Sequence, residues 1–375
     1  MSVDARGKEV DVERVVVVGG GVVGMLSARL LAEQGMCVEV LERIEAGQES
    51  SWAGGGIISP LYPWRYSPAV TALAEWSQTF YPRLGEALKL QVGLDPEVYT
   101  TGLYWLDLED QSEALAWGQA RGFAPVAMDE VYRRVKVLGQ GFSKAIYNPA
   151  LANVRNPRLA KALKAALQSS PHVTLHENTE VLGFVVEHGH VTGVRTANGI
   201  IKGDRVVLCA GAWSGRLLAT LGLALPVMPV KGQMILYKAA PDYLSAMVMA
   251  QGRYAIPRKD GHILIGSTLE HAEFDKTPTD EALTSLQASA HTLLPGLKDM
   301  PVVKHWAGLR PGSPDGIPFI GELEEVKGLW LNCGHYRNGL VLAPASCQLL
   351  ADLMAGQKPI IDPKPYAPGG RLHAV

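Results

Sequence analysis

Hydrophobic residues follow two different spacings in the first forty positions of the chain. The valines at 15–18 form a short unbroken apolar run, which is typical of a buried parallel strand. Over 22–34 the apolar residues recur every three to four positions, which predicts a helix, and Gly35 ends it. A second apolar run at 37–41 predicts another strand. This strand–helix–strand order is typical of an α/β domain with a parallel sheet.

The rest of the chain shows the same two patterns. Helical spacing predicts helices at 68–90, 110–121, 158–168 and 279–294, and another that ends near 355. Shorter apolar runs predict strands at 102–107, 173–176, 181–187, 191–196, 205–208, 233–237, 253–257 and 262–266. The segment after 359 is rich in Pro and Gly, and we expect it to be loosely ordered.

A change of pattern near residue 226 indicates a second domain. The run at 206–215 predicts one more buried strand of the first domain, whereas the strands after 226 alternate with polar residues, as in an antiparallel sheet. We therefore expect a discontinuous nucleotide-binding domain of residues 1–81, 146–225 and 306–375. A substrate domain of residues 82–145 and 226–305 would be inserted into it.

Composition narrows the class of protein. Of the 375 residues 47% are hydrophobic and 19% are charged, as in a globular enzyme with a sizeable core. The net charge of −2 does not indicate a basic surface that would bind nucleic acid. The first thirteen residues are polar and no apolar run reaches membrane length, so we expect a cytoplasmic protein without secretion signal or membrane span. Four cysteines lie far apart, with no metal-binding spacing, and we expect free thiols and no metal: Cys37, Cys209, Cys333 and Cys347.

A glycine motif follows the first strand without a gap. Gly19 permits a tight turn, Gly21 lets a pyrophosphate approach the backbone, and Gly24 lets the helix pack closely on the sheet. The helix N-terminus then faces the phosphates. Glu42 stands at the end of the second strand, about 20 residues further on, where an acidic residue binds ribose hydroxyls. The motif predicts a dinucleotide site; Glu42 argues against NADP, and FAD and NAD both remain open.

A second Gly-rich stretch lies at 49–60. It also holds Trp52, Ile57 and Ile58, which are too apolar for a solvated linker. We therefore expect the backbone of this loop to lie against a bound molecule.

Four segments together resemble the D-amino acid oxidase family of flavoproteins, and within it the bacterial glycine oxidases. They are VVVVGGGVVG at 15–24 with Glu42 and Arg43, SSWAGGGI at 50–57, HWAGLRPGSPDGIPFIG at 305–321, and GHYRNGLVLAP at 334–344. The resemblance covers residues 14 to about 355. It implies FAD as the cofactor, a Rossmann-like FAD-binding domain of the glutathione reductase type, and an antiparallel-sheet substrate domain.

The resemblance also implies which residues hold FAD. Val22 and Val23 would lie at the pyrophosphate, Glu42 and Arg43 at the adenosine ribose, and Val181 at the adenine. The second loop would follow the pyrophosphate and the isoalloxazine ring through Ser50, Ser51, Gly55, Gly56 and Ile57. The last segment would close over the flavin through His335, Tyr336, Arg337, Asn338, Gly339, Leu340 and Val341.

Two absences indicate that the FAD is noncovalent. Related flavoproteins attach the flavin through a Cys in the loop after the LRP motif, and residues 312–321 hold no Cys. Others use a His near the Ser-rich loop, where this chain has Ser51, Trp52 and Ala53.

Family positions imply three residues for the substrate. Arg310 would clamp the substrate carboxylate, because its planar fork binds a carboxylate through two hydrogen bonds. Tyr254 would donate its hydroxyl to the same carboxylate, and Arg337 would add a second charge or bind the flavin alone. Some glycine oxidases carry a His where this chain has Gly252, which predicts room for a somewhat larger substrate.

The implied reaction is oxidative deamination of glycine, sarcosine or small D-amino acids, with O₂ as the acceptor. It needs no His base, because a neutral amine held over the flavin can transfer hydride directly. Two alternatives stay open: a D-amino acid or proline-type dehydrogenase that reduces a quinone, and a flavin module of a larger assembly. Thiamine biosynthesis and amine catabolism are both open as pathways. A homo-oligomer is the family expectation.

Overall fold

The four valines of the first run lie in β3 (Arg14–Val18), a central strand of a six-stranded sheet. Four of its residues, Val15 to Val18, are almost completely buried because helices and strands cover both faces. The structure is a computed structural model that describes residues 2–3, 9–10 and 12–374. The first thirteen residues, for which we expect no secretion signal, therefore lie partly outside the described residues.

The six strands follow the order β10-β4-β3-β14-β22-β21. All neighbours are parallel except β21, which pairs antiparallel with β22. The carboxyl ends of β3, β4 and β14 therefore meet at one edge of the sheet. The strand bounds are β10 Val173–His176, β4 Cys37–Leu41, β14 Arg205–Leu208, β22 Leu329–Cys333 and β21 Phe319–Glu322.

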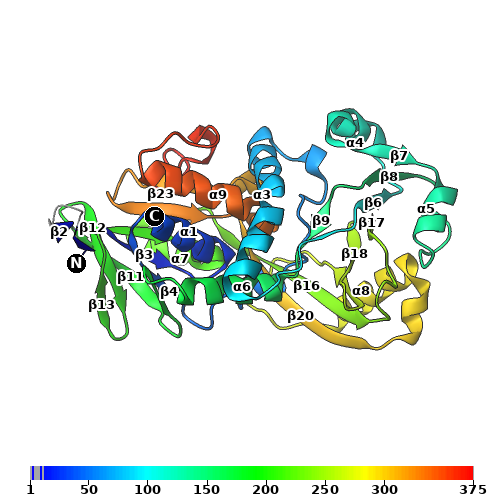
Figure 1. Cartoon of the computed structure of the whole chain (residues 1–375), viewed down its shortest axis with the longest axis horizontal. Coiled ribbons are helices and arrows are strands. Elements are labelled where there is room, and N and C mark those ends of the chain that lie inside the picture. The colour runs from blue at the N-terminus through cyan, green and yellow to red at the C-terminus, as the bar shows by residue number, and fades with distance from the viewer. Residues whose placement is uncertain (1, 4–8, 11, 375) are drawn as a thin grey trace.

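Four helices on one side of this sheet enclose the largest hydrophobic core, three of them against the sheet and α3 against α6 and α9 (Figure 1). They are α1 (Val22–Glu33), α3 (Pro68–Val92), α6 (Asn156–Gln168) and α9 (Gly339–Met354). The other face is covered by a three-stranded antiparallel sheet and a short helix. These are β11 (Val181–Glu187), β12 (His190–Thr196), β13 (Gly199–Lys202) and α7 (Ser214–Ala219).

The second body is built on an eight-stranded sheet, ordered β20-β16-β19-β18-β17-β6-β8-β7. Its pairs are antiparallel except β17 with β6. The bounds are β20 Val302–Gly312, β16 Met228–Lys238, β19 His262–Gly266, β18 Arg253–Pro257, β17 Met247–Ala250, β6 Leu103–Leu106, β8 Ala145–Asn148 and β7 Ala124–Val126. Helices α8 (Asp280–Leu293) and α5 (Met128–Arg134) bury their apolar sides against this sheet.

Short elements complete the chain. The helices are α2 (Ser50–Ala53) and α4 (Gln111–Gly118), with 3-10 turns η1 Pro63–Arg65, η2 Gln119–Arg121, η3 Gly211–Trp213, η4 Pro295–Asp299, η5 Pro314–Gly316, η6 Tyr336–Asn338 and η7 Lys364–Tyr366. The strand pairs are β1 Ser2–Val3 with β2 Glu9–Val10, β5 Tyr99–Thr100 with β9 Ala152–Asn153, and β15 Leu223–Ala224 with β23 His373–Ala374. None of the helices in the described residues combines the length and apolar character that a membrane crossing requires.

The predicted fold class is confirmed: a parallel-sheet α/β body is joined to a second body with a largely antiparallel sheet. The expectation of a loosely ordered tail is wrong for most of the segment after 359. Tyr366 is buried, and its hydroxyl donates a hydrogen bond to the carbonyl of Ala69 over 2.7 Å. The end of the tail then pairs as β23.

The division of the chain into domains stays a proposal. The limit at residue 81 falls inside α3, and the limit at 305 falls inside β20. Because α3 packs against α9 and β20 pairs along its length with β16, we propose to set these limits at the ends of the two elements.

Helix α3 begins and ends with clear local signals. The Ser67 hydroxyl accepts a hydrogen bond from the Val70 N–H, Pro68 occupies the first helical position, and Gly93 adopts a left-handed φ of 70° after the last turn. Along its buried side Tyr81 donates a 2.5 Å hydrogen bond to the carbonyl of Leu340, at the start of α9.

Tyr81→Phe is expected to lower the free energy of unfolding by about 1–2 kcal/mol, because the buried Leu340 carbonyl loses its partner. Chemical denaturation followed by circular dichroism measures the change. Tyr99→Phe serves as the control, since the hydroxyl of Tyr99 bonds to no residue among those described. Equal unfolding midpoints for Tyr81→Phe and wild type would contradict the expectation.

Candidate functional site

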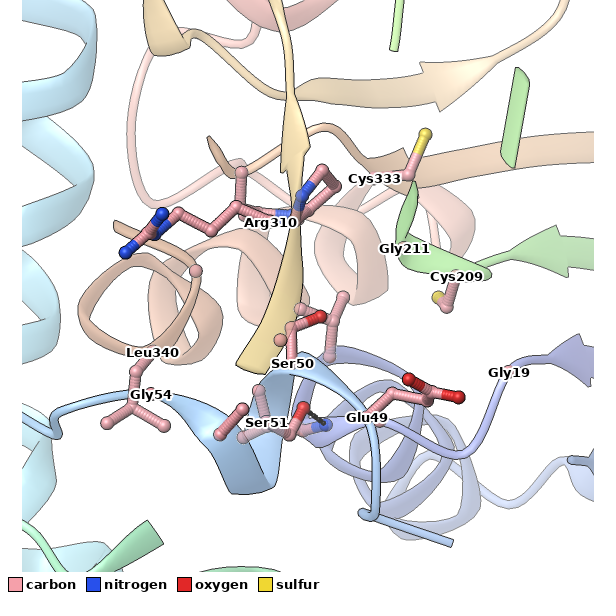
Figure 2. A pocket seen from close by; sticks show the side chains of 18 of the residues that line it. Gly19, Glu49, Ser50, Ser51, Gly54, Cys209, Gly211, Arg310, Cys333 and Leu340 are labelled. Carbon is pink, nitrogen blue, oxygen red and sulfur yellow. Dashed lines mark hydrogen bonds between the residues drawn. The ribbon is translucent and has the colours of Figure 1, made fainter. Parts of the chain in front are cut away.

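One cavity of about 460 Å³ lies where the two bodies meet at the carboxyl ends of β3, β4 and β14. Figure 2 shows Arg310 reaching from β20 on one side, with Ser50 and Ser51 of α2 on the other and Gly19 at the end of β3. In open α/β sheets ligands bind at this edge of the strands. Every site residue predicted from the sequence lines this cavity except Gly24.

The glycine turn has the geometry that the motif predicts. Gly19 adopts a φ of 109°, and a Cβ there would lie 2.5 Å from the Cys209 carbonyl oxygen. A Cβ on Gly24 would lie 1.8 Å from the Gly19 carbonyl oxygen, so Gly24 acts in helix–strand packing and not in the cavity wall. The N–H of Val22, in the first turn of α1, donates a 2.8 Å hydrogen bond to the Ser51 hydroxyl, which joins the two predicted loops (Figure 2).

Glu42 is fixed at the end of β4 by two backbone groups. Its carboxylate accepts hydrogen bonds from the N–H of Gly20 over 2.8 Å and from the N–H of Ile44 over 3.1 Å. Burial raises the pKa of the Glu42 carboxyl above its ordinary value, and these two hydrogen bonds act in the opposite direction. The carboxylate is therefore held rigidly at the cavity wall, with lone pairs left for a ligand's hydroxyl groups.

The second Gly-rich loop lies against the cavity, as the sequence predicts. Gly56 adopts a φ of 84°, and a Cβ there would lie 2.1 Å from the Val154 carbonyl oxygen. Arg258, which the sequence did not indicate, holds this loop: its guanidinium donates to the Gly55 carbonyl over 2.7 Å and to the Asn153 side chain over 2.6 Å. Burial lowers the pKa of Arg258 to about 10.

The segment before α9 brings buried polar atoms to the cavity. His335 and Asn338 are each at most 3% exposed, yet His335 Nε2 and Asn338 Nδ2 have no partner among the described residues. Burial lowers the pKa of His335 to about 3, so its ring is neutral at physiological pH. Buried polar groups without partners are rare in native proteins, so these atoms fit a cavity that binds a polar ligand.

At the far end of the cavity Arg43, which the sequence indicated, lies beside Trp213 and Arg216, which it did not. The Arg43 guanidinium stacks 3.7 Å above the Trp213 ring, and the Arg216 guanidinium 3.5 Å above Phe274. Trp213 and Phe274 lie 5.5 Å apart, centroid to centroid. Lys276, from the same loop as Phe274, pairs with Glu49 over 3.0 Å. The loop before α8 therefore contacts the dinucleotide end of the cavity.

Arg310, Tyr254 and Arg337 come together in the same cavity, although they belong to β20, β18 and the segment before α9. Arg310 forms no ion pair with any described carboxylate; its hydrogen bonds go to two carbonyls and one hydroxyl. Burial lowers the pKa of Arg310, the nearby Tyr254 acts in the opposite direction, and the nearby Arg337 lowers it further. A cation without a carboxylate partner is suited to bind an anionic ligand.

Gly252 does not line the cavity. It forms the turn between β17 and β18 with a φ of 75°, and its N–H donates to the Tyr62 hydroxyl over 3.1 Å. The expectation that Gly252 enlarges the substrate space is therefore not supported.

The cavity fits an extended dinucleotide with an anionic substrate beside it. Its walls combine a glycine turn where side chains would collide and a rigid carboxylate with buried polar atoms and a guanidinium that have no partner and no ion pair, respectively, among the described residues. Cys209 and Cys333 also line it, but burial raises the pKa of Cys333 to about 12 and that of Cys209 well above its ordinary value. Neither thiol is therefore a ready nucleophile.

Comparisons with known proteins agree with this geometry. The model of the FAD dependent oxidoreductase (DAO) family matches residues 14–353. Glycine oxidases of Pseudomonas aeruginosa and Pseudomonas putida are each 66% identical over 96% of this chain, and the chain covers 100% and 99% of them. The crystal structure of glycine oxidase from Geobacillus kaustophilus is 31% identical with a TM-score of 0.89, over 95% of this chain and 98% of that one. The chain therefore belongs to the FAD dependent oxidoreductase (DAO) family.

Proposed function

We propose that this chain is an FAD-dependent oxidase that deaminates glycine, sarcosine or another small amino acid. One amine, one O₂ and one water would give one 2-oxo acid, one H₂O₂ and one ammonia, or methylamine from sarcosine. The observation that carries the proposal is the position of Arg310. Its guanidinium has no described carboxylate partner and lines the same cavity as the glycine turn. The two glycine oxidases at 66% identity support the substrate class.

Different residues of the cavity wall suit the adenosine, the pyrophosphate and the flavin ring of FAD. We assign Glu42 and Arg43 to the adenosine ribose, and Val181 to the adenine. We assign the pyrophosphate and the flavin ring to the two Gly-rich loops and to the segment before α9. These residues are Gly19, Gly21, Val22, Val23, Ser50, Ser51, Gly55, Gly56, Ile57, His335, Tyr336, Arg337, Asn338, Gly339, Leu340 and Val341.

The chemistry that FAD supplies when bound is acceptance of a hydride from the substrate carbon and transfer of the electrons to O₂. The protein's task is then to hold the substrate. Arg310 would bind the carboxylate, and Tyr254, buried in β18, would donate its hydroxyl to the same group. The neutral His335 leaves the positive charge with Arg310 and Arg337, on the side where an anion binds.

Noncovalent binding of FAD is expected, since residues 312–321 hold no Cys and the two cavity thiols stay protonated. Acid precipitation of the purified yellow protein should release all the flavin into the supernatant, where absorbance measures it. Flavin that stays with the pellet would show a covalent bond.

The electron acceptor separates this proposal from a dehydrogenase that reduces a quinone. Glycine, sarcosine, D-alanine and D-proline should each be assayed in air for H₂O₂, and without O₂ for reduction of a quinone-like dye. The proposal expects peroxide at the rate of amine oxidation for at least one substrate. Dye reduction with negligible peroxide for every substrate would favour the dehydrogenase.

A further inference from the structure

The Arg310 guanidinium rests directly on Gly232 of the neighbouring strand β16. A Cβ at position 232 would lie 2.2 Å from each of the two terminal nitrogens of Arg310. Real Cβ atoms do not approach other atoms so closely. Any residue other than glycine at 232 would therefore displace the Arg310 guanidinium from its observed position. The position of the Arg310 charge is therefore set by a residue 78 positions away in the chain, through pairing of β16 with β20.

All the acceptors that hold Arg310 are neutral. Its Nη1 donates to the carbonyls of Lys231 and Thr268, each over 3.2 Å, and its Nη2 donates to the Ser267 hydroxyl over 2.8 Å. A guanidinium has more N–H donors than these three bonds use. The acceptors thus orient the group but leave its positive charge uncompensated, with donors free for a further partner.

The carboxylate of Glu270, in the same loop, is engaged elsewhere. Both its oxygens accept hydrogen bonds from Gln233 Nε2, over 3.0 and 3.1 Å, and one also accepts from the Thr268 hydroxyl. Lys231 Nζ also lies 4.0 Å from one of these oxygens. Glu270 is therefore held by Gln233, Thr268 and Lys231, and it does not form an ion pair with Arg310 among the described residues.

Gln233 is completely buried and fixes the loop that carries the acceptors. Its backbone N–H donates to the Thr268 hydroxyl over 2.8 Å. Its side-chain oxygen accepts from the Thr279 N–H over 2.9 Å, at the far end of the same loop, and from His305 Nε2 over 3.0 Å. Ser267 and Thr268 therefore stand on a rigid support, which a precise ligand site requires.

We propose that Ser267 and Gly232 are positioning residues for substrate binding: they hold the Arg310 guanidinium through neutral contacts, so that its charge is available to the substrate carboxylate. This inference rests on the proposed function of Arg310. If it holds, the side chain at position 267 must be uncharged for Arg310 to bind the substrate carboxylate. A carboxylate at 267 would pair with Arg310 and take the place of the substrate.

The test compares Ser267→Asp with Ser267→Asn, two side chains of nearly the same size that differ in charge. Glycolate, a carboxylate without an amine, is titrated into each FAD-loaded variant, and the change in the flavin spectrum gives its Kd. We expect Ser267→Asp to weaken glycolate binding by about 100-fold relative to Ser267→Asn, because an internal ion pair must be broken. Flavin content should be equal in the two variants.

Ser267→Ala provides a second measurement that does not depend on the folding of Ser267→Asp. It should raise the KM for glycine by about 3- to 10-fold, the effect of one hydrogen bond to a charged group, with kcat changed less. Ser289→Ala on α8 is the matched control, since the one partner of that hydroxyl in the described structure is the Ser285 carbonyl one turn away. Equal glycolate Kd for the Asp and Asn variants, or an unchanged KM in Ser267→Ala, would overturn the inference.

Arg310→Ala in the same titration separates the inference from the proposed function. If Arg310→Ala binds glycolate as tightly as wild type, the proposed function of Arg310 fails. If Arg310→Ala loses glycolate while Ser267→Asp keeps it, the proposed function stands and only the role of position 267 is wrong.

Discussion

Arg310→Ala is expected to lower kcat/KM for glycine by about 3–5 kcal/mol of transition-state stabilisation, the range for truncating one partner of a buried charge pair. Every proposed substrate carries a carboxylate next to its reacting carbon. Without the guanidinium the amine is neither bound nor oriented, so binding and kcat should both fall. Steady-state kinetics with peroxide detection measures the loss.

Arg310→Lys should recover only part of the activity, because an ammonium group does not reproduce the planar fork. Both variants should keep the flavin spectrum of wild type, since Arg310 bonds to β16 and to the Ser267–Thr268 segment and not to the Gly-rich loops. Wild-type amine oxidation by Arg310→Ala would mean that the substrate is an uncharged amine.

Glu42→Arg is expected to weaken FAD binding by about 2–4 kcal/mol, because one buried and one half-buried N–H group lose their acceptor. These are the N–H groups of Gly20 and Ile44, and the new cation would also lie beside Arg43. Flavin retained after dialysis, and the Kd for added FAD, measure the effect.

Glu45→Arg is the matched control in the same loop, since the Glu45 side chain is 61% exposed and, within the described part of the chain, pairs with Lys164 alone. Full flavin content in Glu42→Arg after dialysis would show that Glu42 does not hold the cofactor. Loss of flavin from Glu45→Arg as well would point to a general effect of charge on the loop.

The sequence predicted those parts of the fold that local pattern decides. The valine run, the glycine turn and the start of α3 at Pro68 each depend on residues within a few positions, and the structure has them where they are predicted. Strand β20 was missed because Gly308, Pro311 and Gly312 interrupt its pattern; pairing with β16 overrides this, and Pro311 is tolerated at the sheet edge. The tail looked loose by composition, whereas one buried residue, Tyr366, anchors it.

The residues of the candidate site also fall into those that the sequence could indicate and those that it could not. Residues within recognisable segments, such as Glu42, Ser51 and Arg310, could be singled out because spacing or resemblance marks them. Gly232, Ser267 and Arg258 could not, because what they do depends on which strands and loops lie beside them. Only the pairing of β16 with β20 brings Gly232 beneath Arg310.

The protein is proposed to oxidise a small amino acid with O₂ as the electron acceptor. The ratio of O₂ consumed to products formed tests this most directly. Purified FAD-loaded protein is mixed with glycine in an oxygen electrode, and O₂ consumed, H₂O₂ formed and glyoxylate formed are measured in the same sample with catalase absent. We expect the three amounts to be equal, and Arg310→Ala to give negligible amounts of each. Oxygen consumption that glycine, sarcosine and D-alanine all fail to stimulate would contradict the proposed function.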